Sequence, residues 1–121
     1  MSANFGPSFR AVASIPSYRF VGIDATSAKG GFVIALVDTI TTNPIGISQD
    51  TMITDGSADV AQTGQARIQA GASVTAGDLV GPQTATGKGV TFAVGTTTSM
   101  NARWIALHAG STDAIIKVVH L

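Results

Sequence analysis

The chain has 121 residues, of which 45% are apolar and only 12% are charged, and its seven Lys and Arg balance seven Asp and Glu. An apolar fraction this high excludes a disordered chain, and the scarcity of Glu and Lys, which favour helices, excludes a helical bundle. Zero net charge argues against nucleic-acid binding, and the absence of cysteine excludes disulfides, thiolate zinc sites and cysteine nucleophiles.

The length is typical of a single domain with one core, and the abundance of Gly, Thr, Ala, Val and Ile indicates strands and turns. The N-terminus lacks the pattern of a signal peptide, and the longest apolar run, residues 32–37, is too short to cross a bilayer. We therefore expect a protein that is made in the cytoplasm and has no membrane partner. With so few charges, much of its surface should be weakly polar, as in proteins that belong to assemblies.

The first fourteen residues differ from the remainder, because small residues and a Gly-Pro pair surround scattered apolar side chains. Two interpretations stand: a frayed terminus, or an extended arm that docks on a neighbouring protein. In the second interpretation residues 1–14 form the arm and residues 15–121 form the domain. The side chains that would contact the neighbour are Phe5, Pro7, Phe9 and Val12.

Alternating and continuous apolar runs predict eight short strands in the domain. They cover residues 18–23, 32–37, 45–48, 66–69, 78–80, 90–94, 104–107 and 115–119. Turn residues separate them, among them glycine-containing turns at 29–31 and 87–89 and the Asp-Gly dipeptide at 55–56. Short, evenly punctuated strands predict an all-β fold, either a small barrel or a sandwich, with a short helix over residues 97–103 as the exception.

A weak internal repeat relates the two halves of the chain. Val21-Gly22 followed by Lys29-Gly30 matches Val80-Gly81 followed by Lys88-Gly89 at an offset of 59 residues. The pattern predicts two similar β units, residues 15–50 and 74–119, that share one core. Chance similarity between two strand-rich segments is the alternative.

The Gly-rich segment 81–89 is similar in composition to a phosphate-binding loop but does not have the spacing and residue types of that motif. Five residues rather than four separate the first two glycines, and Gly89 stands where Ser or Thr would hold Mg²⁺. The residues that follow predict a strand, whereas a phosphate-binding loop opens a helix. A hairpin turn is the better interpretation.

No other group of residues indicates catalysis or metal binding. His108 and His120 are too few for a zinc site, which normally needs three or four protein ligands. The Asp residues lie beside turn signals, where their side chains bond to nearby backbone, and no serine has a nucleophile-elbow motif. We therefore predict a protein that is not an enzyme and has no cofactor and no metal. Trp104, the only tryptophan, is expected in the core or, alternatively, as the anchor of an interface.

One run of motifs in the second half of the chain is familiar. Gly71-Ala72-Ser73-Val74-Thr75-Ala76-Gly77-Asp78-Leu79-Val80 is followed by Thr86-Gly87-Lys88-Gly89-Val90, by Trp104-Ile105-Ala106-Leu107 and by the apolar run 115–119. This order resembles the capsid decoration (cement) proteins of tailed bacteriophages. The Trp-containing motif and an extended Thr/Ser loop over residues 95–101 depart from the family's pattern.

The resemblance implies a compact β fold called a β-tulip, with a jelly roll as the alternative that periodicity leaves open, and no active site. It implies a virion protein on the outer capsid surface that binds the major capsid protein and itself, as a homotrimer or alternatively a homodimer. There it would stabilise the expanded head by bridging neighbouring capsomers, and an N-terminal arm would add a strand to a capsid protein. The alternative function is a receptor- or carbohydrate-binding β module of a head fibre or tail, which a single Trp and a single Tyr disfavour.

Overall fold

The computed structural model contains strands and no helix among the residues that it describes. These are residues 9–11, 13–23, 33–36, 44–51, 53–54, 56–58, 60–83, 86–92 and 104–121. The all-β prediction is confirmed, and the short helix expected over residues 97–103 lies outside the described residues. Within the described ranges, no helix has the length and apolarity needed to cross a membrane.

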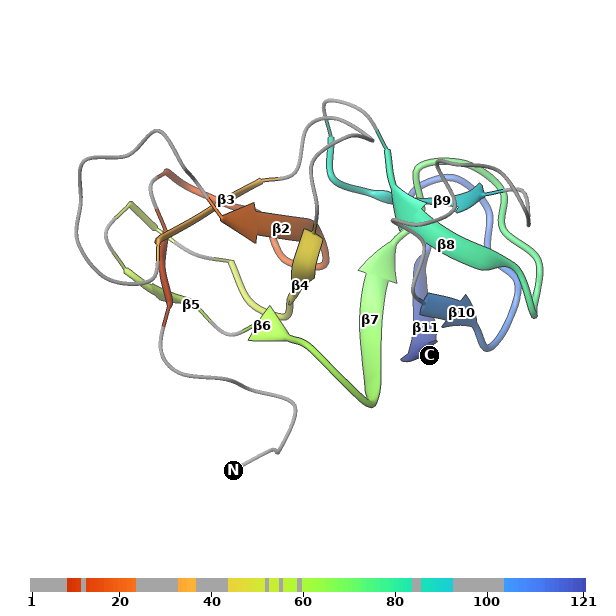
Figure 1. Ribbon diagram of the computed structural model, residues 1–121. Coiled ribbons are helices and arrows are strands. Elements are labelled where there is room, and N and C mark those ends of the chain that lie inside the picture. The colour runs from red at the N-terminus through yellow and green to blue at the C-terminus, as the bar shows by residue number, and fades with distance from the viewer. Residues whose placement is uncertain are drawn as a thin grey trace.

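The described strands form two open sheets, one from each half of the chain, and do not close into a barrel (Figure 1). The first sheet has the order β5-β1-β3-β2-β4-β6 and contains Phe9–Ala11 (β1), Phe20–Ile23 (β2), Val33–Leu36 (β3), Pro44–Ser48 (β4), Ser57–Ala58 (β5) and Val60–Ala61 (β6). The second has the order β7-β11-β10-β8-β9 and contains Gln65–Gln69 (β7), Leu79–Pro82 (β8), Gly89–Phe92 (β9), Trp104–Ala106 (β10) and Ile115–His120 (β11). Neighbouring strands are antiparallel except β1 and β3, which are parallel.

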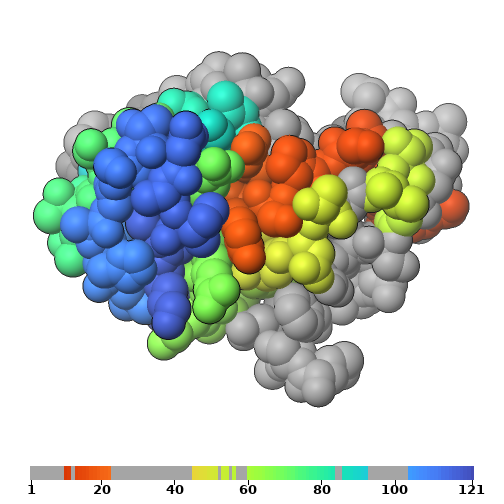
Figure 2. Space-filling view, turned by 180° about the vertical axis from the view of Figure 1, so that it is seen from behind, coloured from red at the N-terminus to blue at the C-terminus, as the bar shows by residue number. Residues whose placement is uncertain are grey.

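The two sheets lie side by side as two lobes. In Figure 1 the orange and yellow strands of the first sheet are on the left, and the green to blue strands of the second are on the right. Figure 2, from behind, shows the same two lobes in direct contact. We call the described part of residues 9–61 the N-lobe and that of residues 65–121 the C-lobe.

One core connects the lobes. Its main cluster combines Phe20, Ile47 and Ala61 of the N-lobe with nine buried side chains of the C-lobe, including Trp104 and Ile116. A smaller cluster lies within the N-lobe. It consists of Ala11, Ile15, Val21 and Val60, with Ile45 packed against it. Because the main cluster draws on both sheets, neither lobe buries its apolar face without the other.

Two strands of the C-lobe alternate between buried and outward-facing side chains. In β7 Ala66 and Ile68 are buried and in β11 Ile116 and Val118 are buried, while Arg67 and Lys117 point outward. β8 and β9 pair antiparallel as a hairpin, as predicted, and Gly87 in the described part of the turn has a φ of 69°. This left-handed backbone suits glycine. The other two glycines of the segment, Gly81 and Gly89, lie in β8 and β9.

The structure differs from the prediction mainly in the N-lobe. The strand expected over residues 18–23 begins only at Phe20, because Tyr18 has a φ of 63°, a left-handed conformation that breaks the extended pattern. Residues 9–11, expected within the arm, form β1 between β3 and β5. The sequence did not predict β5 or β6. Each has only two residues, which is too short to show an alternation of apolar and polar side chains.

The lobes share one strand arrangement. β2 lies between β3 and β4 in the N-lobe, as β8 lies between β9 and β10 in the C-lobe, with antiparallel pairing in both. At the offset of 59 residues, Val21 of β2 corresponds to Val80 of β8, and both side chains are fully buried. The two sets of three strands therefore have the same order and the same antiparallel pairing.

Candidate functional site

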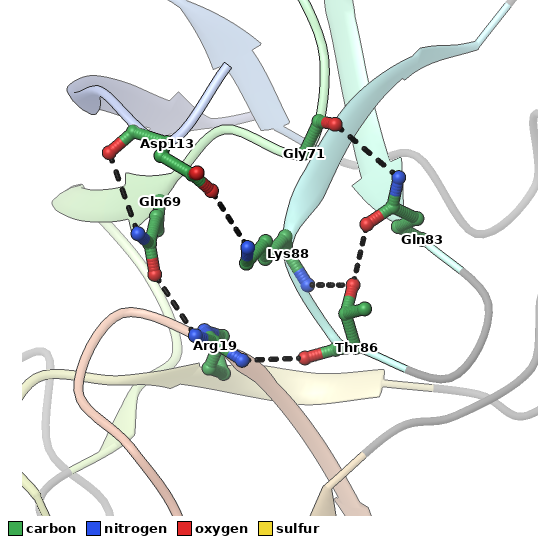
Figure 3. Close-up of polar contacts among 7 residues, drawn as sticks. All are labelled: Arg19, Gln69, Gly71, Gln83, Thr86, Lys88 and Asp113. Carbon is green, nitrogen blue, oxygen red and sulfur yellow. Dashed lines mark hydrogen bonds and ion pairs between the residues drawn. The ribbon is translucent and has the colours of Figure 1, made fainter.

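The polar contacts between the lobes centre on Arg19, which directly precedes β2 (Figure 3). Its Nη1 donates a hydrogen bond to the backbone oxygen of Thr86 at 3.0 Å, and its Nη2 donates to Oε1 of Gln69 at 2.9 Å. Thr86 lies in the β8–β9 turn and Gln69 ends β7, so one side chain ties the start of β2 to two elements of the C-lobe. The Nε atom is buried and has no hydrogen-bond partner within the described residues.

The contacts of Arg19 continue into the C-lobe as a chain of polar groups (Figure 3). Gln69 Nε2 donates to the backbone oxygen of Asp113 at 3.4 Å, and Asp113 Oδ1 pairs with Lys88 Nζ at 2.6 Å. Thr86 Oγ1 donates to Gln83 Oε1 at 2.6 Å. The side chains of the ion pair are 21% and 59% exposed, so the pair contributes less than about 1 kcal/mol. We call Arg19, Gln69, Gln83, Thr86, Lys88 and Asp113 the junction network.

A second set of contacts covers the free edge of β7, the outermost strand of its sheet. Gln49 follows β4, and its amide Nε2 donates to the backbone oxygen of Arg67 at 3.2 Å while its Oε1 accepts from the Arg67 N–H at 3.3 Å. The Gln69 N–H donates to the backbone oxygen of Tyr18 at 3.0 Å. A side-chain amide carries the same donor and acceptor as a peptide group, so Gln49 satisfies an edge that would otherwise invite pairing with another chain.

Tyr18 is held in its left-handed conformation by both of its backbone groups. Its N–H donates to the backbone oxygen of Ser48 at 2.7 Å, and its oxygen accepts from Gln69. A bulky residue at positive φ costs about 1–3 kcal/mol and persists only where the surroundings impose it. The two hydrogen bonds impose it here, and they place the only tyrosine of the chain at the wall of a surface hollow.

This hollow has a volume of about 400 Å³ and lies where Tyr18 and Gln49 adjoin β7 and β11. Its lining residues are Tyr18, Gln49, Gln65, Ala66, Arg67 and Lys117. Arg67 and Lys117 face each other directly across the β7–β11 pair. The lining therefore combines two cations, an aromatic ring and two amides, and none of these described residues carries a carboxylate.

The predicted arm residues fall largely outside the described part of the chain. Phe5, Pro7 and Val12 are not among the described residues. Phe9 begins β1, whose two edges are both occupied, by β3 and by β5. Residues 9–11 are thus a strand of the N-lobe sheet, and Ala11 is fully buried in the smaller cluster.

Trp104 and the two histidines occupy structural positions. Trp104 is 3% exposed in the main core cluster, which is the first of its two expected locations. His120 stacks edge-on against its ring, with 4.9 Å between ring centroids. His108 accepts a hydrogen bond at Nε2 from the Lys117 N–H at 3.1 Å. Among the described residues, no group of three or more His, Cys, Asp or Glu could hold a metal ion.

The sequence did not predict that the residues of the junction network, or those of the hollow, lie together. The alternation of Gln65-Ala66-Arg67-Ile68-Gln69 does predict that Arg67 points outward. Its pairing with Lys117 depends on the β7–β11 register, and its contact with Gln49 depends on how the lobes meet. Neither relation has a local sequence signal.

The fold has a counterpart among solved structures. The crystal structure of the N base of the head fibre protein gp8.5 of bacteriophage phi29 matches 94% of this chain and 91% of its own chain, with a TM-score of 0.70 and 14% sequence identity. At this identity the likeness shows the fold. No family model matches the chain, and no curated protein matches it.

Proposed function

We propose that the chain is a structural protein of a bacteriophage head, attached to the outer surface of the capsid through the major capsid protein. The observation that carries the proposal is the fold, which is similar to that of a head fibre base over nearly the whole of both chains. The low charge content also supports the proposal. It leaves large apolar side chains exposed on the surface, and a neighbouring protein would cover them. Among the described residues these are Ile53, Leu107, Ile115 and Leu121.

The proposed role at this surface is to stabilise the expanded head by bridging neighbouring capsomers, as a homotrimer with a homodimer as the alternative. A protein that binds only the assembled shell stabilises that shell by mass action, and a symmetric oligomer adds its separate contacts into strong attachment. This role requires no chemistry of the protein itself, so we propose that it is not an enzyme and acts without a cofactor.

A second candidate function is the base of a head fibre, which the gp8.5 likeness specifically favours. In this role the chain would occupy the head surface and carry a projection, without reinforcing the shell. The two candidates differ in what the head loses when the protein is missing.

The particle experiment distinguishes the two roles. Heads of the virus that encodes the chain, prepared with and without its gene, are heated while DNA release is recorded. A bridging protein predicts release at a lower temperature without the chain and recovery when purified protein is added, since binding is linked to shell stability. A fibre base predicts loss of a surface projection with the release temperature unchanged. Absence of the chain from purified wild-type particles, measured by mass spectrometry, would contradict both roles.

A truncation tests whether the N-terminal arm attaches the protein to heads, and the position of β1 sets where the truncation should end. Deleting residues 2–8 removes Phe5 and Pro7 but keeps β1. We expect the shortened protein to remain folded and to lose at least about tenfold in affinity for heads, because strand addition derives its affinity from main-chain hydrogen bonds. Deleting residues 2–11 also removes buried Ala11 and should lower stability as well. Unchanged binding by the first variant would show that the arm does not attach.

A further inference from the structure

The hollow beside β7 gathers positive charge without an opposite charge. Arg67 and Lys117 are direct cross-strand partners, and both residues are exposed. Like charges at such positions destabilise a sheet. Among the described residues, the structure gives neither cation an ion pair, whereas Lys88 pairs with Asp113. The hollow therefore has an unfavourable arrangement that an anionic ligand would relieve.

Specific hydrogen bonds hold two residues of the wall of the hollow, Tyr18 and Gln49, in place. Tyr18 is fixed by hydrogen bonds at both backbone groups in a conformation that a tyrosine rarely adopts. Gln49 is anchored to the backbone of Arg67 by both amide atoms. Strained backbone held in place by its surroundings is concentrated at binding and catalytic sites. Here the strained residue, Tyr18, lines the same hollow as Arg67 and Lys117.

The volume and lining indicate the class of ligand. About 400 Å³ lies within the range of small-molecule sites and exceeds what a lone carboxylate fills. Of the six lining residues only Ala66 is aliphatic, and an apolar ligand would leave Arg67 and Lys117 without a counter-charge. A sugar ring offers a face to stack on an aromatic side chain and hydroxyls for polar groups, and a carboxylate on that ring would meet the cations.

We propose that this hollow binds an acidic sugar, a pyranose that carries a carboxylate, with its carboxylate at Arg67 and Lys117 and its ring against Tyr18. The site is distinct from the proposed attachment to the head and does not depend on it. It adds an anion-recognition function to a chain whose overall charge is zero.

The test is a titration of the full, isotopically labelled chain followed by amide NMR shifts. The probes are glucuronate, glucose as the neutral sugar of the same ring, and acetate as a carboxylate without a ring. We expect glucuronate to shift resonances of β7, β11 and Tyr18 and to bind at least about tenfold more tightly than either control. Binding should weaken as salt is raised, because the cations are exposed.

Three variants locate the ligand. Lys117→Gln and Arg67→Gln should each weaken glucuronate binding about five- to tenfold, as expected for one charge–charge contact near a surface. Arg10→Gln makes the same charge change on β1, in the other lobe, and should leave binding unchanged. Tyr18→Asn removes the ring but keeps a residue that tolerates positive φ, so it should weaken binding while the fold is retained.

The outcomes separate the proposal from its alternatives. Equal binding of acetate and glucuronate would show a plain anion site and overturn the sugar assignment. Shifts that are insensitive to both Arg67→Gln and Lys117→Gln would place binding elsewhere and overturn the site. No shift with any probe at concentrations up to tens of millimolar would overturn the proposal altogether, and none of these results bears on whether the protein attaches to heads.

Discussion

Replacing Phe20 by alanine is expected to lower the free energy of unfolding by about 3–5 kcal/mol, the usual cost of removing a buried aromatic side chain. Phe20 is fully buried and, with Ile47 and Ala61, represents the N-lobe in the main core cluster. A domain of this size has a total stability of about 5–15 kcal/mol, so the variant loses a large share of it. Urea unfolding followed by far-UV circular dichroism measures the loss.

The same experiment tests whether the lobes unfold together. Trp104 is the only tryptophan and lies in the same cluster, so its fluorescence reports on the C-lobe side of the shared core. We expect the fluorescence and circular dichroism transitions of Phe20→Ala to shift by the same amount, as in a two-state transition. Ile53→Ala, at a side chain that is 70% exposed, is the control and should change stability by less than about 0.5 kcal/mol. A tryptophan transition that stays in place would show that the lobes are independent.

The second large effect is expected at Arg19, the centre of the junction network. Arg19→Met keeps an unbranched stem but removes the donors to Thr86 and Gln69. Hydrogen bonds to charged groups contribute about 1.5–3 kcal/mol each, and part-buried acceptors left without donors add a cost. The unpartnered Nε offsets some of this, because its burial is unfavourable in the wild type. We therefore expect a net loss of about 2–4 kcal/mol, measured by urea unfolding.

A double-mutant cycle isolates the contact between Arg19 and Gln69. Arg19→Met and Gln69→Ala together should destabilise less than the sum of the two single variants, because both remove the same hydrogen bond. Arg10→Met is the matched control, since it changes an exposed arginine of the same chain, and it should alter stability by less than about 0.5 kcal/mol. Additive effects of Arg19→Met and Gln69→Ala would mean that the hydrogen bond contributes nothing to stability.

The two expected effects have the same functional consequence. The exposed apolar side chains proposed for attachment are distributed between the lobes, with Ile53 on the N-lobe and Leu107 and Ile115 on the C-lobe. A partner can contact them at once only if the lobes keep one relative position. The shared core and Arg19 provide that constraint, so variants at the junction should also weaken attachment to heads.

How far the sequence predicts the structure depends on the length of each element. β7 and β11 are five and six residues long, and the strands predicted over residues 66–69 and 115–119 match them to within one residue at each end. Which of their faces is buried was established by the structure. Phe20–Ile23 was found as a strand, but its start was placed two residues early. The side chain of Tyr18 fits the alternation of a strand. Its backbone, however, is held out of the extended conformation by hydrogen bonds to Ser48 and Gln69, which lie far along the chain.

Amino-acid composition and local periodicity by themselves determined that this protein is an all-β domain with a charge-poor surface, because both properties follow from which side chains alternate along a few residues. Only the tertiary structure decided that residues 9–11 are an inner strand, that Arg19 joins the lobes, and that Arg67 faces Lys117 across a hollow walled by Tyr18. These relations join residues about 20 to 70 positions apart in the chain. They arise from strand register and from the contact of two sheets, and neither is encoded in any short segment.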